Sequence, residues 1–203
     1  HARGMKLVMD LVVNHTSDEH AWFTASRDKA SDKRDWYIWR PARPGHEPGT
    51  PGAEPTNWSS FFGGPAWEFD EASGEYYLHL FSRKQPDLNW ENPAVRQAVY
   101  AMMRWWVDRG VDGFRMDVIN LISKTYPLSD GPVEPGQTMS FDVNRGANGP
   151  RMIEFIEEMN AAVGLTDKHL FTVGEMVNVD VARARQYTSQ NHPRLGMVFT
   201  FEH

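Results

Sequence analysis

The chain has 203 residues, of which 40% are hydrophobic and 24% are charged, and its formal net charge is −6. This composition is ordinary for a globular protein, and the negative charge gives no electrostatic reason to expect nucleic acid or an anionic membrane as a partner. A neutral small-molecule substrate fits best. The sequence has no cysteine, which excludes disulfides and thiolate chemistry and suits a reducing compartment, so we expect a cytoplasmic protein.

The first predicted element is a strand in residues 5–13, an apolar run interrupted only by Asp10. A run of this kind suits a strand that is buried on both faces of a parallel sheet. Residues 18–30 are predicted to form a short helix, for which Ser17 or Asp18 is the expected cap.

The next part of the sequence is predicted to be a small, irregular inserted domain, residues 16–90. Residues 40–55 are rich in proline and glycine and predict a loop. Residues 74–81 alternate between polar and apolar side chains, as in a half-buried strand. Large aromatic residues flank the loop and are expected to form a small core: Trp36, Trp39, Trp58, Phe61, Phe62 and Trp67.

A strong helix signal begins at Asn92, a capping residue, followed by Pro93 in the first turn, and it ends at Gly110. From there helices and strands alternate with tight joints, which is typical of a parallel α/β fold. Four strands are half of a (β/α)8 barrel, which needs roughly 250 residues, so we expect a fragment of such a barrel. The further predicted strands are 111–118, 169–176 and 196–201, and the further helices are 150–163 and 179–188.

Two of these strands end in acidic residues, Asp117 and Glu175. Because strand side chains alternate with period two, Gly113, Arg115 and Asp117 share one face. The charge of Arg115 is then expected to hold Asp117 ionised, as a nucleophile requires. A purely structural Arg–Asp bridge inside the barrel is the alternative interpretation.

Glu175 follows Gly174 among apolar neighbours, where partial desolvation would raise its pKa, as a proton donor to a leaving group requires. Placement on adjacent strands would permit the carboxyl separation of roughly 5–5.5 Å that retaining glycosidases use. The pair therefore indicates cleavage of a glycosidic bond.

Asp10, Asn14 and His15 form a third polar group near the end of the first strand. Asp10 could bond sugar hydroxyls or support the barrel, and Asn14 and His15 could bind sugar or ligate a metal. A Ca²⁺ site needs six or more oxygen ligands, which the sequence does not provide locally. We therefore predict no metal and no cofactor.

Four segments resemble conserved motifs of the α-amylase superfamily, glycoside hydrolase family 13. The segment 85–90 (QPDLNW) is similar to the motif of the oligo-1,6-glucosidase/α-glucosidase branch. The other three are 10–15 (DLVVNH), 113–117 (GFRMD) and 174–176 (GEM). The motifs occur in the family's order and cover nearly the whole chain.

The resemblance implies an incomplete (β/α)8 TIM barrel with an inserted domain. Residues 1–15 would be barrel strand 3, residues 16–90 the inserted domain B that closes one side of the pocket, and residues 91–203 barrel strands 4 to 6 with their helices.

The resemblance also implies the roles of the site residues. Asp117 would be the nucleophile and Glu175 the general acid/base. Arg115 and His15 would hold substrate and nucleophile, with Asp10 in support. Phe81 is included among the substrate-binding residues.

Three further positions bear on the resemblance. Val118, directly after the implied nucleophile, is similar to family members that cleave α-1,6 links. Lys124 resembles a lysine that replaces the calcium ion of true α-amylases, although it could equally be a solvated surface charge. The family's third acidic residue, an aspartate near a histidine on barrel strand 7, has no match, and Glu202 is better suited to the loop after strand 6.

The predicted function is a retaining α-glucosidase that removes terminal α-linked glucose from short oligosaccharides, with the fragment itself inactive and its parent a monomer. A close alternative is a transglycosylating relative that isomerises sucrose or forms trehalose. A non-catalytic, partner-binding family member and a metal-dependent hydrolase are the remaining alternatives.

Overall fold

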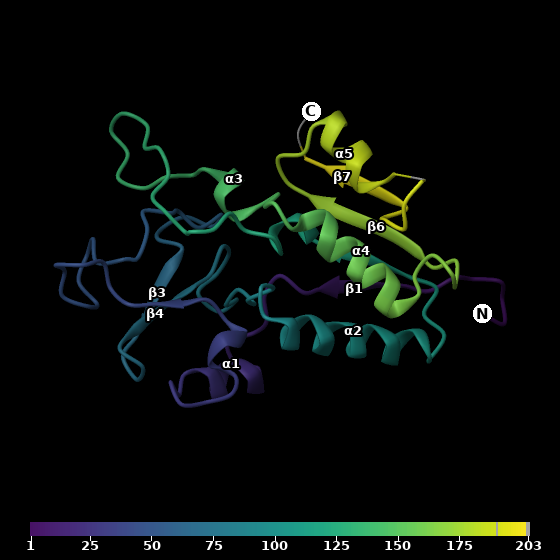
Figure 1. Ribbon diagram of the computed structural model, residues 1–203, viewed down its shortest axis with the longest axis horizontal. Coiled ribbons are helices and arrows are strands. Elements are labelled where there is room, and N and C mark those ends of the chain that lie inside the picture. The colour runs from purple at the N-terminus through teal and green to yellow at the C-terminus, as the bar shows by residue number, and fades with distance from the viewer. Residues whose placement is uncertain (190, 202–203) are drawn as a thin grey trace. The chain divides into compact units, whose positions relative to one another are not determined.

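The computed structural model describes residues 1–189 and 191–201, and the chain divides into two compact units (Figure 1). The first unit contains residues 1–14, 93–124 and the described part of 147–203. The second contains His15–Asn92 and Thr125–Gly146. Residues 125–146 are predicted to belong to the barrel segment 91–203, whereas in the structure they cluster with the second unit.

The first unit is built on a four-stranded parallel sheet with the order β1-β5-β6-β7. Each strand pairs with its neighbour in sequence order within the unit, as helix–strand repeats predict. The four strands predicted for this part are confirmed, with the bounds β1 Val8–Val12, β5 Gly113–Asp117, β6 Phe171–Met176 and β7 Met197–Thr200.

The predicted helices of the first unit are also present. They are α2 Pro93–Val107, α4 Met152–Val163 and α5 Val181–Tyr187, with a short 3-10 turn, η2, at Ile119–Leu121. Along α2 the apolar residues Val95, Val99 and Met103 are buried. The α2 helix packs on α4, where Arg96 Nε donates to Glu158 Oε2 at 2.8 Å.

The prediction that the first strand is buried on both faces is wrong. Leu11 of β1 is 2% exposed, but Val8 and Val12 are 42% and 43% exposed. Successive side chains of a strand point to opposite faces, so only the face that bears Leu11 is covered within the described chain.

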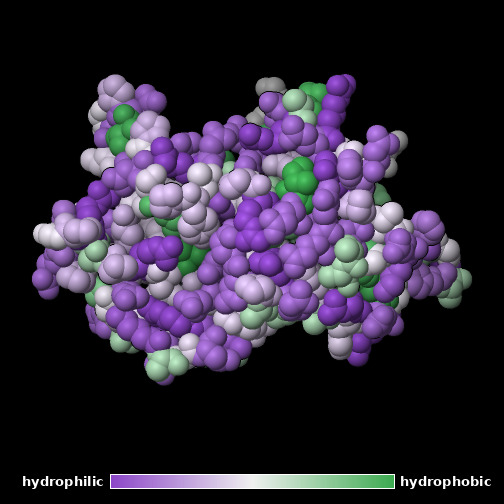
Figure 2. Space-filling view, in the orientation of Figure 1, coloured by the Kyte–Doolittle hydropathy of each residue, from purple (hydrophilic) through white to green (hydrophobic). Residues whose placement is uncertain are grey.

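Other large hydrophobic side chains are also exposed, among them Met5, Phe62 and Val181. The face of the protein in Figure 2 is largely hydrophilic, and its hydrophobic residues form small separate groups. Among the described residues seen on this face there is no continuous apolar patch of the kind that marks a large interface.

The second unit contains a small antiparallel sheet with the order β2-β4-β3. Its strands are β2 Trp39–Arg40, β3 Trp67–Asp70 and β4 Glu75–Leu78, and only β4 was predicted. Strands of two to four residues carry too little periodicity to be recognised in a sequence. The unit also has the helices α1 Ala21–Ser26 and α3 Val143–Gly146 and a 3-10 turn, η1, at Arg34–Trp36.

The predicted helix at 18–30 is shorter than expected and has a different cap. His20 Nδ1 accepts from the backbone N–H of Trp22, so His20 is the N-cap of α1. Ser17 Oγ instead accepts from Glu19 N at 3.1 Å, and Asp18 pairs with Lys84 at 3.1 Å.

An aromatic core fills the second unit, as predicted from its tryptophans. Trp36, Trp39, Trp58 and Trp67 are all buried. Of the two phenylalanines predicted to join them, Phe61 is half-buried, and Phe62 is 72% exposed and therefore does not belong to this core.

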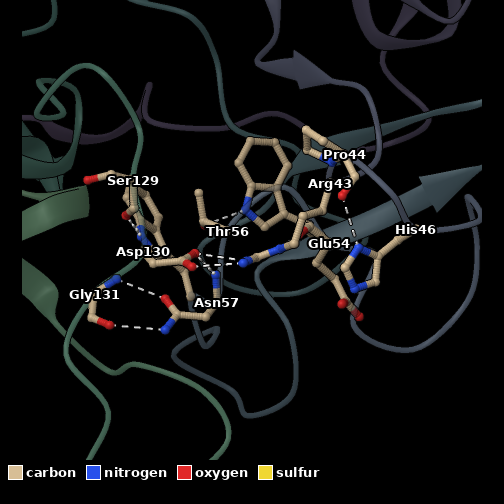
Figure 3. Close-up of polar contacts among 11 residues, drawn as sticks. Arg43, Pro44, His46, Glu54, Thr56, Asn57, Ser129, Asp130 and Gly131 are labelled. Carbon is tan, nitrogen blue, oxygen red and sulfur yellow. Dashed lines mark hydrogen bonds and ion pairs between the residues drawn. The ribbon is translucent and has the colours of Figure 1, made fainter.

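Polar contacts join residues 43–58 to the segment 125–146 within the second unit (Figure 3). Both terminal nitrogens of Arg43 donate to the two carboxylate oxygens of Asp130, each at 2.8 Å. The Asn57 side chain bonds both the N–H and the C=O of Gly131, at 2.8 and 3.0 Å. Trp58 Nε1 donates to the carbonyl of Ser129 at 2.9 Å. These contacts explain why 125–146 clusters with the second unit.

None of the helices in the described part of the chain has both the length and the apolar character needed to cross a bilayer. The cytoplasmic location stays a prediction.

Candidate active site

The site in the first unit is organised around Arg115, on the central strand β5. Its Nη1 donates to Asp10 Oδ1 on β1 and to Asp117 Oδ1 on β5, each at 2.7 Å. Its Nη2 contacts Glu175 Oε2 on β6. One guanidinium therefore meets carboxylates from three adjacent strands.

Strand register places these side chains together. Asp10 lies opposite Arg115 in the β1–β5 pair, and Val173 lies opposite Arg115 in the β5–β6 pair. Side chains two residues apart on a strand share a face, so Asp117 and Glu175 lie on the face of Arg115, one step nearer the carboxyl ends of the strands.

The contacts also restrict how far apart Asp117 and Glu175 are. Each carboxylate touches a terminal nitrogen of the same guanidinium. The distance between their nearest oxygens is therefore at most the sum of the two oxygen–nitrogen contacts and the spacing of the two terminal nitrogens within the guanidinium. An arrangement in which the two carboxylates point to opposite ends of the sheet is excluded.

The charges around Arg115 differ in one respect from the prediction, which placed Glu175 among apolar neighbours only. Burial opposes the charge of Arg115, but hydrogen bonds to Asp10 and Asp117 outweigh it and raise the pKa of the guanidinium. Glu175 is only 8% exposed, as the expected desolvation requires. However, Glu175 Oε2 also contacts Arg115 Nη2, a cationic partner that the expectation did not include. This contact depends on the register between β5 and β6, which no local pattern in the sequence indicates.

Val118, which directly follows Asp117, has a strained backbone. Its φ is 36° and its ψ is 43°, in the left-handed region, and its side chain is buried. A β-branched residue rarely adopts positive φ, at a cost of about 1–3 kcal/mol, and such residues persist where the surroundings hold them. No signal in the sequence indicates this conformation.

Lys124 is 3% exposed, so the alternative of a solvated surface charge is wrong. Its Nζ donates to the carbonyl of Leu121 at 2.9 Å and to Asn14 Oδ1 at 3.3 Å. A fixed cation therefore lies inside the first unit. Across residues 1–189 and 191–201, there is no group of three or more His, Cys, Asp or Glu side chains that could hold a metal ion.

The other two predicted site residues, His15 and Phe81, lie together in the second unit. Their rings are 5.4 Å apart, and Phe81 stacks on Phe61 at 5.0 Å. His15 is 6% exposed, and its Nε2 lies 3.1 Å from Gln85 Nε2. His15 also forms a β-bridge with Asp87, so the motif 85–90 helps to hold it. Glu202 lies outside the described residues.

Asn120 is a buried polar residue that the sequence analysis missed. It is 0% exposed, and its side chain bonds Val177, which lies beyond Glu175 in the sequence. The only available signal was an amide in the apolar stretch 118–122.

Comparison with known proteins gives the family. The profile described as "Alpha amylase, catalytic domain" matches residues 1–203. The chain is 55% identical to an oligo-1,6-glucosidase of Halalkalibacterium halodurans and 56% identical to one of Parageobacillus thermoglucosidasius, in each case over 100% of this chain and 35% of the relative. The chain thus spans about a third of the length of these curated relatives.

Solved structures agree with this result. A crystal structure of Bacillus licheniformis trehalose-6-phosphate hydrolase has 47% identity and a TM-score of 0.88, over 99% of this chain and 34% of that one. Isomaltulose synthase from Erwinia rhapontici has 41% identity and a TM-score of 0.87, over 98% and 34%. The parallel sheet, the small antiparallel sheet and the full-length match show that this chain belongs to the alpha-amylase catalytic-domain family.

Proposed function

We propose that this chain is the central part of a retaining α-glucosidase of the oligo-1,6-glucosidase type, which removes terminal α-linked glucose from short oligosaccharides. The observation that carries the proposal is the meeting of Asp117 and Glu175 at one guanidinium, Arg115. The names of the oligo-1,6-glucosidase relatives support the substrate class.

Asp117 is the nucleophile of the proposed reaction. It attacks the anomeric carbon while Glu175 donates a proton to the leaving oxygen, so the glycosidic bond breaks and a glucosyl–Asp117 ester forms. Glu175, now ionised, then takes a proton from water, which attacks the same carbon; the bond to Asp117 breaks, and glucose and the free Asp117 carboxylate are released. Arg115 holds both carboxylates in place, and Asp10 holds Arg115.

In the proposed whole protein, the four parallel strands are barrel strands 3 to 6, and most of the second unit is domain B. His15 and Phe81 contact the substrate. Lys124 serves as the buried cation in place of calcium, a role that its burial and its bonds to Asn14 and Leu121 support.

A transglycosylating enzyme is the second candidate, because an isomaltulose synthase is among the similar structures. Hydrolysis of isomaltose is favoured by the higher identity to the oligo-1,6-glucosidases and by Val118. Product analysis with isomaltose, maltose and sucrose separates the two. Conversion of sucrose to an isomeric disaccharide as the main product would favour the second candidate.

The test of the first proposal is Asp117→Asn in the full-length protein. Without an ionised nucleophile, kcat on isomaltose should fall at least about 1,000-fold. The matched control is Asp112→Asn, since Asp112 bonds Lys6 and the N–H of Leu7 at the amino-terminal end of β5 and should leave turnover close to wild type. Retained turnover in the Asp117 variant would rule out the assignment.

A further inference from the structure

We propose that Asn120 is a positioning residue that sets the placement of Glu175 relative to Asp117. It does so by joining the turn that follows β5 to the turn that follows β6. The proposal rests on the function proposed above and concerns the same pair of carboxylates.

The side chain of Asn120 bonds both backbone groups of Val177. Its Nδ2 donates to the Val177 carbonyl at 2.7 Å, and its Oδ1 accepts from the Val177 N–H at 3.2 Å. The amide therefore pairs with Val177 as a neighbouring strand would. Because Asn120 is 0% exposed, water cannot replace these hydrogen bonds when they are lost.

The position of the Asn120–Val177 contact along the chain explains its proposed role. The backbone ladder between β5 and β6 runs from Gly113–Phe171 to Met116–Gly174, and the two carboxylates come directly after it. Beyond the ladder, Asn120 bonds the chain again at Val177. Asp117 and Glu175 thus lie between the ladder and the Asn120 contact, which together restrain both segments.

A second amide, Asn148, holds Asn120 in turn. Asn120 Nδ2 donates to Asn148 Oδ1 at 3.0 Å, and the Asn148 N–H donates to the Asn120 carbonyl at 2.8 Å. Asn148 also donates to the Asn178 carbonyl at 3.1 Å and accepts from the Tyr187 hydroxyl of α5 at 3.0 Å. We call Asn120, Asn148, Val177, Asn178 and Tyr187 the Asn120 network.

Backbone strain is concentrated at the same place. Of the four non-glycine residues with positive φ in the described chain, three lie in or next to the Asn120 network: Val118 at 36°, Asn148 at 55° and Asn178 at 51°. Strained conformations persist only where the surroundings hold them. The network supplies these restraints directly after each of the two carboxylates.

A purely structural role is the competing explanation, and Asn160 provides a matched control. Asn160 is 4% exposed and lies in the same unit, and its side chain also makes three hydrogen bonds, two to Thr166 and one to the Arg194 carbonyl. Thr166 and Arg194 precede β6 and β7, so Asn160 bonds the amino-terminal side of the sheet, away from the carboxylates.

The experiment compares Asn120→Ala with Asn160→Ala in the full-length protein, on isomaltose and on α-glucosyl fluoride. Fluoride leaves without a proton, so its release does not need Glu175 as an acid, whereas the leaving sugar of isomaltose does. If Asn120→Ala displaces Glu175, kcat on isomaltose should fall about 100-fold, and the fluoride-to-isomaltose ratio of kcat should rise about tenfold. Asn160→Ala should lose similar stability but keep this ratio.

A second variant, Asn148→Gly, keeps the experiment decisive if Asn120→Ala does not fold. Glycine accepts the positive φ of residue 148, and the substitution removes the anchor of Asn120 while leaving its bonds to Val177. The fluoride-to-isomaltose ratio of kcat should rise in this variant too, but by a smaller factor than in Asn120→Ala.

Crystal structures give a readout that does not depend on activity. In the Asn120 variant, the separation between the carboxyl groups of Asp117 and Glu175 should change relative to wild type. The proposal is overturned if the wild-type enzyme hydrolyses isomaltose but the Asn120 variant keeps both the kcat ratio and the carboxyl separation of wild type. That result would leave the glucosidase assignment intact. A wild-type protein that acts on neither substrate would instead contradict the proposed function.

Discussion

The two units of the chain hold distant segments together with different kinds of polar contact. In the first unit the Asn120 network uses neutral amide and backbone groups, and Asn120 is fully buried. In the second unit an ion pair between Arg43 and Asp130, whose side chains are 32% and 46% exposed, joins the segments beside the neutral bonds of Asn57 (Figure 3).

This difference decides what each contact contributes. Losing a partner in a buried neutral network leaves unpaired groups that cost about 1–3 kcal/mol each, largely independent of salt. An exposed ion pair is worth up to about 1 kcal/mol and is screened by salt. The first unit should therefore tolerate little change near the carboxylates, whereas the second should tolerate more.

The largest expected effect is that of Gly113→Ala in β5. An added Cβ would lie 2.2 Å from the carbonyl oxygen of Phe171 on the paired strand, and a backbone atom cannot move aside as a flexible side chain can. The free energy of unfolding should fall by about 3 kcal/mol, as measured by urea denaturation. At Gly52 of the second unit, where φ is +86° and nothing lies within 4 Å, alanine should cost only about 1 kcal/mol. Equal losses of unfolding free energy in the Gly113 and Gly52 variants would contradict the expected difference between the two units.

An intermediate effect is expected from His79, a buried residue of the second unit. Burial lowers the pKa of His79 below its ordinary value of 6.5, and its Nδ1 lies 3.1 Å from the Phe81 carbonyl. As the pH falls through 6.5, His79 of the unfolded chain binds a proton, whereas His79 of the folded chain does so only at its lower pKa. The stability that is present above pH 6.5 is therefore lost as the pH falls from 6.5 toward that lower pKa. His79→Asn, which keeps a donor but does not titrate, should remove this pH dependence of the unfolding free energy. A slope that persists in the variant would assign it to another group.

The smallest effect is expected from Asp130→Asn. The Arg43 guanidinium holds the pKa of Asp130 below its usual value of 3.8, so the contact contributes above that pH and is lost as the pH falls through the lower, folded pKa. At neutral pH the substitution should cost less than about 1 kcal/mol, and 1 M salt should reduce the difference further. A larger, salt-independent loss would mean that this contact behaves like the buried network.

Much of the fold was predictable from local pattern. The strands around Asp10, Asp117 and Glu175 and the helix that begins at Pro93 have clear periodicity, caps and stops, and the structure has all of them. The strands β2 and β3 were missed because they are too short to show a period and exist through pairing with β4.

The candidate site was predictable in part, for a similar reason. The contact between Arg115 and Asp117 follows from period two within one strand, and the structure has it at 2.7 Å. The contact between Arg115 and Glu175 needs the register of two strands that are far apart in the sequence, so it could not be predicted.

The amino-acid sequence by itself determined the parallel α/β pattern, the acidic ends of two strands and the family, because these depend on the order of residues along the chain. Tertiary structure alone decided that Lys124 is buried, that Val118 is left-handed, that residues 125–146 belong to the second unit and that Asn120 bonds the segment after Glu175. Each of these depends on groups that come from different segments, and no local pattern encodes where such segments meet.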